Sequence, residues 1–374
     1  PDLQWQAPHC RSGRKKKDKI RIGFISAFLF PHHTIGKLNL GLIRNLSREK
    51  FSVRVFQFRG KDGKISRDEH IPADEYVLLP SAYPAARQAI AEQKLDILFY
   101  LDIGMDPLTY FLAYARLAPV QCVTWGHPVT TGIPNMDYFI SAEMLEPEDA
   151  QIHYTEKLIC FKKISTYYYR PKMPERPSGR ENLKLPEDKN LYTCPQTLFK
   201  FHPDYDHVLK EILRKDPKSV LVLLEGKYPE WKDALKTRFL KNFPNAENRL
   251  IFLKFLPLAD YLSLLMVSDA VMDPLYFGGG NSSYEAFSCG VPVVTWPGPY
   301  MRGRVTSAAY HQMEMKDCIA DDFQSYVHKT LQLVHDREWK NFLQEKIHHQ
   351  SCVLFEDKEV VTEFETFFET VINR

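Results

Sequence analysis

The sequence predicts an α/β protein with two doubly wound parallel sheets. Short β-rich runs alternate with helical patterns over residues 20–150. The alternation stops in a segment rich in Pro, Lys and Tyr and begins again at Leu191. Strands separated by helices indicate parallel sheets with helices on both faces. A length of 374 residues fits two such domains.

The N-terminal domain is placed at residues 19–150, after a basic lead-in over residues 1–18. Its strands are predicted from β-rich runs at 20–26, 51–58, 76–79, 95–101, 120–125 and 138–141. Helical spacing of apolar residues falls between them at 38–46, 85–93 and 108–117. Residues 151–187 lack clear periodicity, and we place the interdomain linker there.

The C-terminal domain is placed at residues 188–352. Its strands are predicted at 191–194, 220–224, 250–253, 270–273 and 291–295, and its helices at 204–214, 231–242, 258–267 and 282–289. A closing segment, 353–374, contains a helix over 358–372. That helix carries an apolar stripe, which must pack on another surface, at Val361, Phe364, Phe367, Phe368 and Val371.

Composition excludes several classes of protein. A net charge of +2 gives no reason to expect nucleic-acid binding, and no apolar run reaches the length of about 18 residues that a membrane span needs. Seven dispersed cysteines, with no pair close enough for a metal knuckle, fit a reducing compartment better than a disulfide scaffold. We therefore expect a cytoplasmic protein without a structural metal.

The most informative stretch runs from Val271 to Thr295 and indicates a strand end, a glycine loop and a helix start. Gly278, Gly279 and Gly280 allow close backbone approach or a positive φ. They precede three candidate N-cap residues, Asn281, Ser282 and Ser283. Free N–H groups at such a helix start suit a phosphate, and Glu285 in the first turn suits a ribose. The alternative is a structural turn with a conventional cap.

Several segments together resemble one family, in order and in spacing. They lie at residues 33–36, 118–121, 125–132, 136–138, 194–200, 273–280 and 290–295. This set resembles the catalytic region of the O-GlcNAc transferase/SPINDLY glycosyltransferases, a family that includes bacterial protein O- and N-glycosyltransferases. The resemblance covers residues 19–372.

The resemblance implies a GT-B architecture: two Rossmann-like domains with a cleft between them and a C-terminal helix that crosses back. It implies an inverting enzyme that moves N-acetylglucosamine or glucose from a UDP-sugar to a Ser, Thr or Asn side chain of a polypeptide. It implies no required metal or other cofactor. A GDP-sugar donor, a non-protein acceptor and an inactive nucleotide-sugar-binding module stay open as alternatives.

For the C-terminal domain, the resemblance implies a donor-binding role for one set of residues. Lys200 matches the lysine that contacts the donor diphosphate. Around it, Gln196 and Thr197 would lie near the nucleotide, and Glu285 would bind the ribose. The diphosphate cradle would be Gly279, Gly280, Asn281, Ser282 and Ser283, and the base would be framed by Leu256, Pro257 and Tyr261. Arg304 is a further candidate.

For the N-terminal domain, the resemblance implies acceptor-side and sugar-side roles. His33 would face the acceptor, as a general base or as an orienting residue, and Asp96 is the alternative base. His127, Thr130 and Thr131 would face the donor sugar. The alternative for this last group is turn chemistry, and the alternative for Asp96 is a structural hydrogen-bond acceptor.

Overall fold

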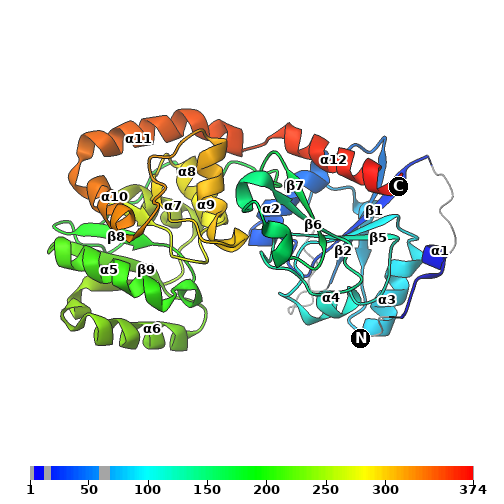
Figure 1. Ribbon diagram of the computed structural model, residues 1–374, viewed down its shortest axis with the longest axis horizontal. Helices are drawn as coiled ribbons and strands as arrows, with labels where there is room; N and C mark the ends of the chain where they lie inside the picture. Colours follow the sequence, from blue (N-terminus) through cyan, green and yellow to red (C-terminus); the bar gives the residue numbers. More distant parts are fainter. Residues whose placement is uncertain (1–3, 12–17, 59–67, 374) are drawn as a thin grey trace. The chain divides into compact units, whose positions relative to one another are not determined.

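The structure is a computed structural model that describes residues 4–11, 18–58 and 68–373 as two compact units (Figure 1). The N-terminal unit comprises the chain up to Tyr169 together with the segment from Glu356 onward, and the C-terminal unit is Arg170–Phe355. Each unit is a parallel sheet covered by helices, which confirms the predicted α/β class.

The N-terminal unit contains a seven-stranded parallel sheet of order β3-β2-β1-β4-β5-β6-β7 within the described chain. Its strands are β1 (Ile20–Ile25), β2 (Phe51–Gln57), β3 (Tyr76–Leu78), β4 (Ile97–Tyr100), β5 (Val120–Thr124), β6 (Tyr138–Ala142) and β7 (Lys157–Phe161). The chain runs outward from β1 to β3 and then returns to β4 on the other side of β1. The strand order therefore reverses between β1 and β4.

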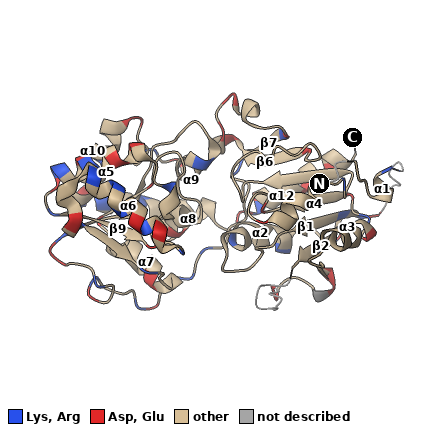
Figure 2. Ribbon diagram, turned by 90° about the horizontal axis from the view of Figure 1, so that it is seen from below, with Lys and Arg blue, Asp and Glu red and all other residues tan. Residues whose placement is uncertain are grey.

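Two pairs of helices cover this first sheet (Figure 1). One face carries α2 (Thr34–Asn45) and α12 (Lys358–Ile372), and the other carries α3 (Tyr83–Glu92) and α4 (Pro107–Leu112). All four residues of β4 are buried, as expected for a strand with helices on both faces. Charged residues gather on the outer helices and are sparse on the strands (Figure 2).

The C-terminal helix belongs to the N-terminal unit, as predicted. All five residues of its apolar stripe are buried. Phe364 packs edge-on against Phe161, with ring centroids 4.8 Å apart, and Phe368 contacts Phe51 at 6.0 Å. Burying each phenylalanine contributes about 1.5–3 kcal/mol, so this helix is an integral part of the first core.

The C-terminal unit contains a five-stranded parallel sheet of order β10-β9-β8-β11-β12 within the described residues. Its strands are β8 (Asn190–Cys194), β9 (Ser219–Leu224), β10 (Leu250–Leu253), β11 (Ala270–Met272) and β12 (Val293–Val294). One layer of helices contains α5 (Pro203–Lys215), α6 (Pro229–Asn242) and α10 (Phe323–His335). The other contains α7 (Leu258–Val267), α8 (Asn281–Ser288) and α11 (Arg337–Gln350), with α9 (Val305–Gln312) beside α8.

The structure differs from the sequence-based boundaries in three places. Strand β7 lies inside the range assigned to the linker and pairs with β6 along its whole length, so the N-terminal unit extends to Tyr169. Helix α2 begins at Thr34 rather than at residue 38. Helices α9, α10 and α11 occupy a stretch for which the sequence analysis predicts no individual elements.

The predicted lead-in is partly ordered against the N-terminal unit. The backbone pairs there with Arg116, through hydrogen bonds from Ala7 N to Arg116 O and from Arg116 N to Trp5 O. Trp5 also lies 4.3 Å from the guanidinium of Arg87. The basic residues 12–17 of the lead-in lie outside the described residues.

Across the ranges that the structure describes, no helix has the length and apolar character needed to cross a membrane.

Candidate functional site

The carboxyl ends of β8 and β11 are the point where the strand order of the second sheet reverses. The chain leaves β8 toward β9 and β10 and then returns to β11 on the opposite side of β8. Loops from adjacent strands diverge at such a point and leave a crevice that binds ligands in α/β proteins. Residues 195–202 follow β8, and residues 273–280 follow β11. Two segments that the sequence analysis singled out therefore meet here.

Lys200 provides a cation at this point. It ends a short 3-10 helix, Leu198–Lys200, and its Nζ donates to Gln196 Oε1 at 2.9 Å and to the carbonyl oxygen of Gly278 at 2.8 Å. Burial lowers the pKa of the Lys200 ammonium to about 8, while the charge of Asp273 acts in the opposite direction. Both contacting acceptors are neutral, and an ammonium has three donors. One N–H of the Lys200 ammonium therefore has no hydrogen bond to the described residues, and this group can bind an anion.

Gln196 connects the two loops. Its side chain is buried, and its Nε2 donates to the Ser282 hydroxyl at the start of α8. With Oε1 accepting from Lys200, the amide fixes the lysine relative to that helix. Gln196 is therefore a positioning residue in this structure. Thr197 is exposed and makes no capping bond, and its contact with the nucleotide stays a prediction.

The glycine loop is shaped by Asp273, a fully buried carboxylate that the sequence analysis did not single out. Asp273 Oδ1 accepts from Gly279 N at 2.6 Å. A Cβ at Gly278 would lie 2.5 Å from Asp273 Oδ2, and one at Gly279 would meet the Ser283 hydroxyl. Neither glycine has a positive φ, and the positive φ in this loop belongs to Tyr276, at 68°. The glycines are thus required by close packing and not by backbone conformation.

The first turn of α8 differs from the predicted cap. Gly280 occupies the N-cap position without a side-chain bond, so none of the three predicted cap residues serves as one. Ser282 is engaged by Gln196, and Ser283 Oγ lies 2.7 Å from Thr306 Oγ1. Asn281 Oδ1 is buried without a hydrogen-bond partner among the described residues.

The backbone of this turn is also left unpaired. The amides of Asn281 and Ser282 donate no hydrogen bond to any residue that the structure describes. Unpaired N–H groups at a helix N-terminus, with the positive end of the helix dipole, favour an anion such as phosphate.

Glu285 lies on α8 and Tyr261 on the neighbouring helix α7. Glu285 is buried and lies in the second turn of α8, not in the first as expected. Burial raises the pKa of the Tyr261 phenol well above its usual range, and the charge of Glu285 adds to this effect. The Tyr261 hydroxyl is buried without a partner in the described chain. Leu256 and Pro257 precede α7 directly, with Pro257 as its N-cap residue. Contacts of these residues with a nucleoside stay predictions.

Arg304 lies at the start of α9, at the N-cap position. Its Nη1 donates to the carbonyl oxygen of Gly298 at 3.2 Å. The guanidinium therefore has a structural contact in this loop.

The carboxyl ends of β1 and β4 form the corresponding reversal point of the N-terminal sheet, and Asp102 lies there. The sequence analysis missed this residue, although an acid directly after an apolar strand is a usable signal. Asp102 Oδ2 accepts from Ala27 N at 2.7 Å and from Ser26 Oγ at 2.9 Å. Burial raises the pKa of the Asp102 carboxyl to about 6. The two hydrogen bonds and the nearby Thr109 hydroxyl act in the opposite direction and lower this pKa. By geometry, Oδ1 accepts no hydrogen bond from the described residues.

His33 is the N-cap of α2. Its Nδ1 accepts from Ile35 N at 3.2 Å, and its ring stacks on Phe28 with centroids 5.0 Å apart. Burial lowers the pKa of the His33 imidazole, and Lys37 lowers it further. Because Nδ1 accepts, the neutral ring carries its proton on Nε2. In this state His33 is a hydrogen-bond donor rather than a base.

Asp96 lies at the amino ends of the strands of the same sheet, opposite to the carboxyl ends. It precedes β4 directly, and its Oδ2 accepts from Arg21 N at 2.8 Å. The structure does not bring Asp96 to the carboxyl ends of the strands, where His33 and Asp102 lie. Its position matches the structural alternative, so we do not retain it as a candidate base.

The loop after β5 is held by Glu156, another residue that the sequence analysis missed. Thr130 Oγ1 donates to Glu156 Oε2 at 2.7 Å, and Thr131 donates to Oε1 through both its backbone N, at 2.8 Å, and its hydroxyl. The hydroxyl protons of both threonines are therefore engaged, which favours turn chemistry over sugar binding. His127 lies against Gly104, and burial lowers the pKa of its imidazole. Its contact with a sugar stays a prediction.

No group of three or more His, Cys, Asp or Glu side chains is placed to hold a metal ion among the described residues. The expectation that no metal is required stays a prediction.

Solved glycosyltransferases share this fold. A mutant of the O-GlcNAc transferase of Thermobaculum terrenum matches with a TM-score of 0.78 and 23% identity, over 95% of this chain and 68% of that one. The Anabaena protein Alr3699/HepE, solved in complex with UDP, matches with a TM-score of 0.58 and 14% identity, over 95% and 100% of the two chains. These similarities concern the fold, and they confirm the predicted GT-B class.

Curated proteins are similar in sequence. The probable UDP-N-acetylglucosamine–peptide N-acetylglucosaminyltransferase SEC of Arabidopsis thaliana is 25% identical over 303 residues, which are 78% of this chain and 30% of that protein. The UDP-glucose:protein N-beta-glucosyltransferase of Actinobacillus pleuropneumoniae serotype 7 is 24% identical over 266 residues, 67% of this chain and 40% of that protein. This chain thus spans less than half of the length of these relatives.

The sequence pattern of glycosyl transferase family 41 matches residues 4–170 and 172–364, which together are nearly the whole chain. This match includes the loops after β8 and β11 and the capped start of α2. The segments that suggested the resemblance thus lie within the two matched ranges, and the chain belongs to glycosyl transferase family 41.

Proposed function

We propose that this chain is an inverting glycosyltransferase that moves a sugar from a UDP-sugar to a polypeptide side chain. The observation that carries the proposal is a group of positively polarised hydrogen-bond donors at the ends of β8 and β11, with no carboxylate hydrogen-bonded to them among the described residues. There the Lys200 ammonium has only neutral partners, and the first two amides of α8 have none among the described residues. The relatives named above act on peptide or protein acceptors with UDP-sugars, which supports the proposed substrates.

In the proposed reaction, an oxygen or nitrogen of the acceptor attacks the anomeric carbon from the side opposite the diphosphate. The proton of the acceptor passes to solvent water, the bond from that carbon to the diphosphate oxygen breaks with its electron pair staying on the oxygen, and UDP leaves. Negative charge grows on the leaving oxygen in the transition state. Lys200 and the N-terminus of α8 would stabilise this charge without reorganisation, because both are already held in place. No metal ion is needed for that role.

The nucleoside would lie on the α7 and α8 side of the phosphates. Tyr261 and Glu285 are buried on these two neighbouring helices, and the Tyr261 hydroxyl has no hydrogen-bond partner in the described residues. We propose that Glu285 binds the ribose hydroxyls and that the segment from Leu256 to Tyr261 frames the base. The free Asn281 Oδ1 in the same region can accept a hydrogen bond from the donor.

On the acceptor side we propose that His33 orients the acceptor through its Nε2–H group. Its Nδ1 already accepts the cap bond from Ile35, so proton removal by His33 would require that bond to break. The role in orientation keeps the start of α2 intact.

The direct test has two steps. First, UDP, GDP, UDP-N-acetylglucosamine, UDP-glucose and a GDP-sugar are compared for their effect on the melting temperature. A ligand that binds only the folded chain must raise that temperature, so a response to uridine nucleotides alone is expected. Second, the radiolabelled sugar of the best donor is followed into protein, with and without EDTA. Label in protein that is insensitive to EDTA supports the proposal.

Other outcomes contradict parts of the proposal. A response to GDP alone rules out the UDP donor. Binding without transfer to protein or peptide indicates a nucleotide-sugar-binding module. Alkaline β-elimination of the labelled product separates Ser or Thr linkage, which is cleaved, from Asn linkage, which is not.

A further inference from the structure

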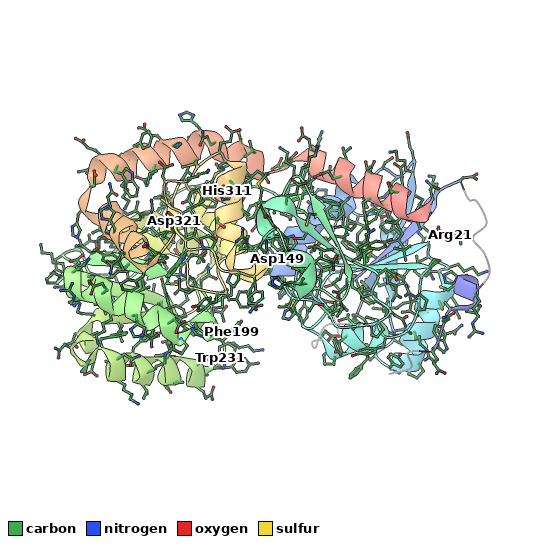
Figure 3. All side chains as sticks on the ribbon, in the orientation of Figure 1. Arg21, Asp149, Phe199, Trp231, His311 and Asp321 are labelled. Carbon is green, nitrogen blue, oxygen red and sulfur yellow. The ribbon has the colours of Figure 1, made fainter. Side chains whose placement is uncertain are left out.

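Four aromatic side chains, two exposed and two half-buried, form a row near the carboxyl ends of the strands of the second sheet. We call Phe199, Tyr228, Trp231 and Phe277 the aromatic surface. Phe199 is 59% exposed and Tyr228 is 47% exposed. Figure 3 shows Phe199 and Trp231 side by side at the edge of the C-terminal unit. Large aromatic residues at such exposure, gathered in one patch, are unusual unless the patch binds something.

The rings of the aromatic surface touch in sequence. Tyr228 and Trp231 have centroids 4.8 Å apart, Trp231 and Phe199 5.4 Å, and Phe199 and Phe277 6.1 Å. The contacts of Phe199 with Trp231 and with Phe277 are edge-to-face. The residues lie in the three segments that follow β8, β9 and β11, so the fold gathers them from separate parts of the chain.

The aromatic surface is continuous with the proposed phosphate site. Phe199 directly precedes Lys200, and Phe277 directly precedes Gly278 in the glycine loop. The Lys200 Nζ lies 4.4 Å from the centroid of the Phe277 ring. A ligand on this surface is therefore next to the diphosphate of a bound donor.

The nucleoside of the donor lies elsewhere in the proposed arrangement. Tyr261 and Glu285 belong to α7 and α8, which form one helix layer of the sheet. Trp231 belongs to α6, which lies in the other layer and contacts the short helix that contains Phe199. The aromatic surface therefore extends from the proposed phosphate site on the α6 side of the sheet, away from the proposed nucleoside site.

The length of the row favours a polypeptide over a single sugar. One hexose ring covers one aromatic ring, whereas this row has four rings in succession. An extended chain advances about 3.3 Å per residue, so the row spans roughly five residues of an extended peptide. Tyr and Trp are also the residues that most often dominate binding between proteins.

We propose that the aromatic surface binds the acceptor polypeptide and selects apolar or aromatic side chains near the modified residue. This inference rests on the proposed function. It adds a specificity: peptides with such a side chain a few residues from the acceptor Ser, Thr or Asn are preferred over peptides without one.

The test uses two synthetic nine-residue peptides with the same central acceptor residue. One has Phe at positions two to four residues from the centre, and the other has Gly there. We expect the wild-type chain to favour the Phe peptide at least tenfold in kcat/KM. Trp231→Ala and Tyr228→Ser should both lose this preference, while the KM for the donor stays unchanged. Tyr228 is the more exposed of the two, so its variant remains informative if Trp231→Ala unfolds.

Phe342→Ala is the matched control, because Phe342 is 53% exposed in the same unit but lies on α11. It should keep the wild-type preference. Equal use of both peptides by the wild type, or an unchanged preference in both variants, would overturn the inference while leaving the proposed function intact. A rise in donor KM instead would mean that the surface binds the donor. Absence of any sugar transfer by the wild type would overturn both proposals.

Discussion

The carboxyl ends of the two sheets share one topology but differ in their electrostatics. In both units the strand order reverses beside the first strand, which places a crevice there. In the C-terminal unit, this point holds a lysine with neutral partners and helix amides without partners in the described chain. In the N-terminal unit, it holds the buried carboxylate of Asp102, and Glu156 engages the next loop. The two sheets share the reversal of strand order, and the side chains around it give the two points different charge.

The largest expected effect comes from removing the cation. Lys200→Met should lower turnover by a factor of about 10²–10³, the usual loss when one preorganised charge donor in a transition state is removed. Steady-state kinetics with labelled donor measure the effect. Lys210→Met is the control, since Lys210 is an exposed lysine on α5. Wild-type turnover in the Lys200 variant would remove the main assignment of the C-terminal site.

The pH dependence of donor binding provides the second test. In the free protein the pKa of Lys200 is about 8, below its ordinary value of 10.5. A bound diphosphate favours the charged form and raises this pKa. Donor affinity should therefore be constant below pH 8 and fall about tenfold per unit above it. Calorimetric titration with UDP from pH 6.5 to 9.5 measures the slope, and a flat profile in Lys200→Met is the expected control.

Asp102→Asn tests the charge in the N-terminal unit. The folded-state pKa of about 6 lies above the ordinary 3.8, so the folded state binds more protons between these values. Stability should therefore fall as pH rises from 4 to 6, by up to about 3 kcal/mol. The asparagine variant, which can still accept from Ala27, should lack this dependence. The test is the free energy of unfolding of both proteins, measured with denaturant between pH 4 and 7. If its pH dependence is the same for the wild type and the asparagine variant, Asp102 does not titrate in this range.

The glycine loop can be tested with a matched pair. A Cβ at Gly279 would meet two serine hydroxyls and Gln196, whereas a Cβ at Gly280 has nothing within 4 Å. Gly279→Ala should cost about 1–3 kcal/mol of stability and weaken UDP binding, while Gly280→Ala should leave the stability nearly unchanged. Denaturant unfolding with UDP titration measures both. Equal effects at the two positions would contradict the packing account.

His33 has the smallest expected effect on stability and separates two roles. His33→Ala should cost about 1 kcal/mol through loss of the helix cap, and His33→Asn should restore that stability because asparagine also caps well. If His33 orients the acceptor, the asparagine variant should still show a raised KM for the acceptor. Full recovery of activity in His33→Asn would show that the residue is only a cap.

Much of the fold could be predicted because its strands are apolar and its helices amphipathic. The stripe on α12 is an example. Five apolar residues at helical spacing predict packing against another surface, and in the structure they pack on the first sheet. Strand β7 was missed because it lies at a sheet edge, in a segment whose prolines and tyrosines hid the short apolar run. Among the helices after β12 that were not predicted, α9 is short and mixes small polar residues with its apolar ones, and α11 is rich in charged residues.

The candidate site was predictable at the level of segments but not of atoms. Lys200 and the glycine loop stood out by residue type, and the structure brings them together. Asp102 and Asp273 were missed although each follows an apolar strand, and Glu156 was missed because it lies in a loop with no local pattern that marks it as buried. The roles of Ser282, Ser283 and Thr131 also differed from expectation, since each hydroxyl is engaged by a partner far away in the sequence or across a loop.

The sequence by itself determined the two α/β units, through periodicity, and the family, through the order of its motifs. The attachment of the last helix to the first unit was implied by the family resemblance, since its apolar stripe alone required only some surface to pack on. The tertiary structure decided which polar groups are paired. Whether Lys200 meets a carboxylate or a carbonyl, and whether His33 is a base or a cap, depends on partners brought together by the sheet. Hydrogen bonds act over about 3 Å, a distance that no spacing in the sequence specifies.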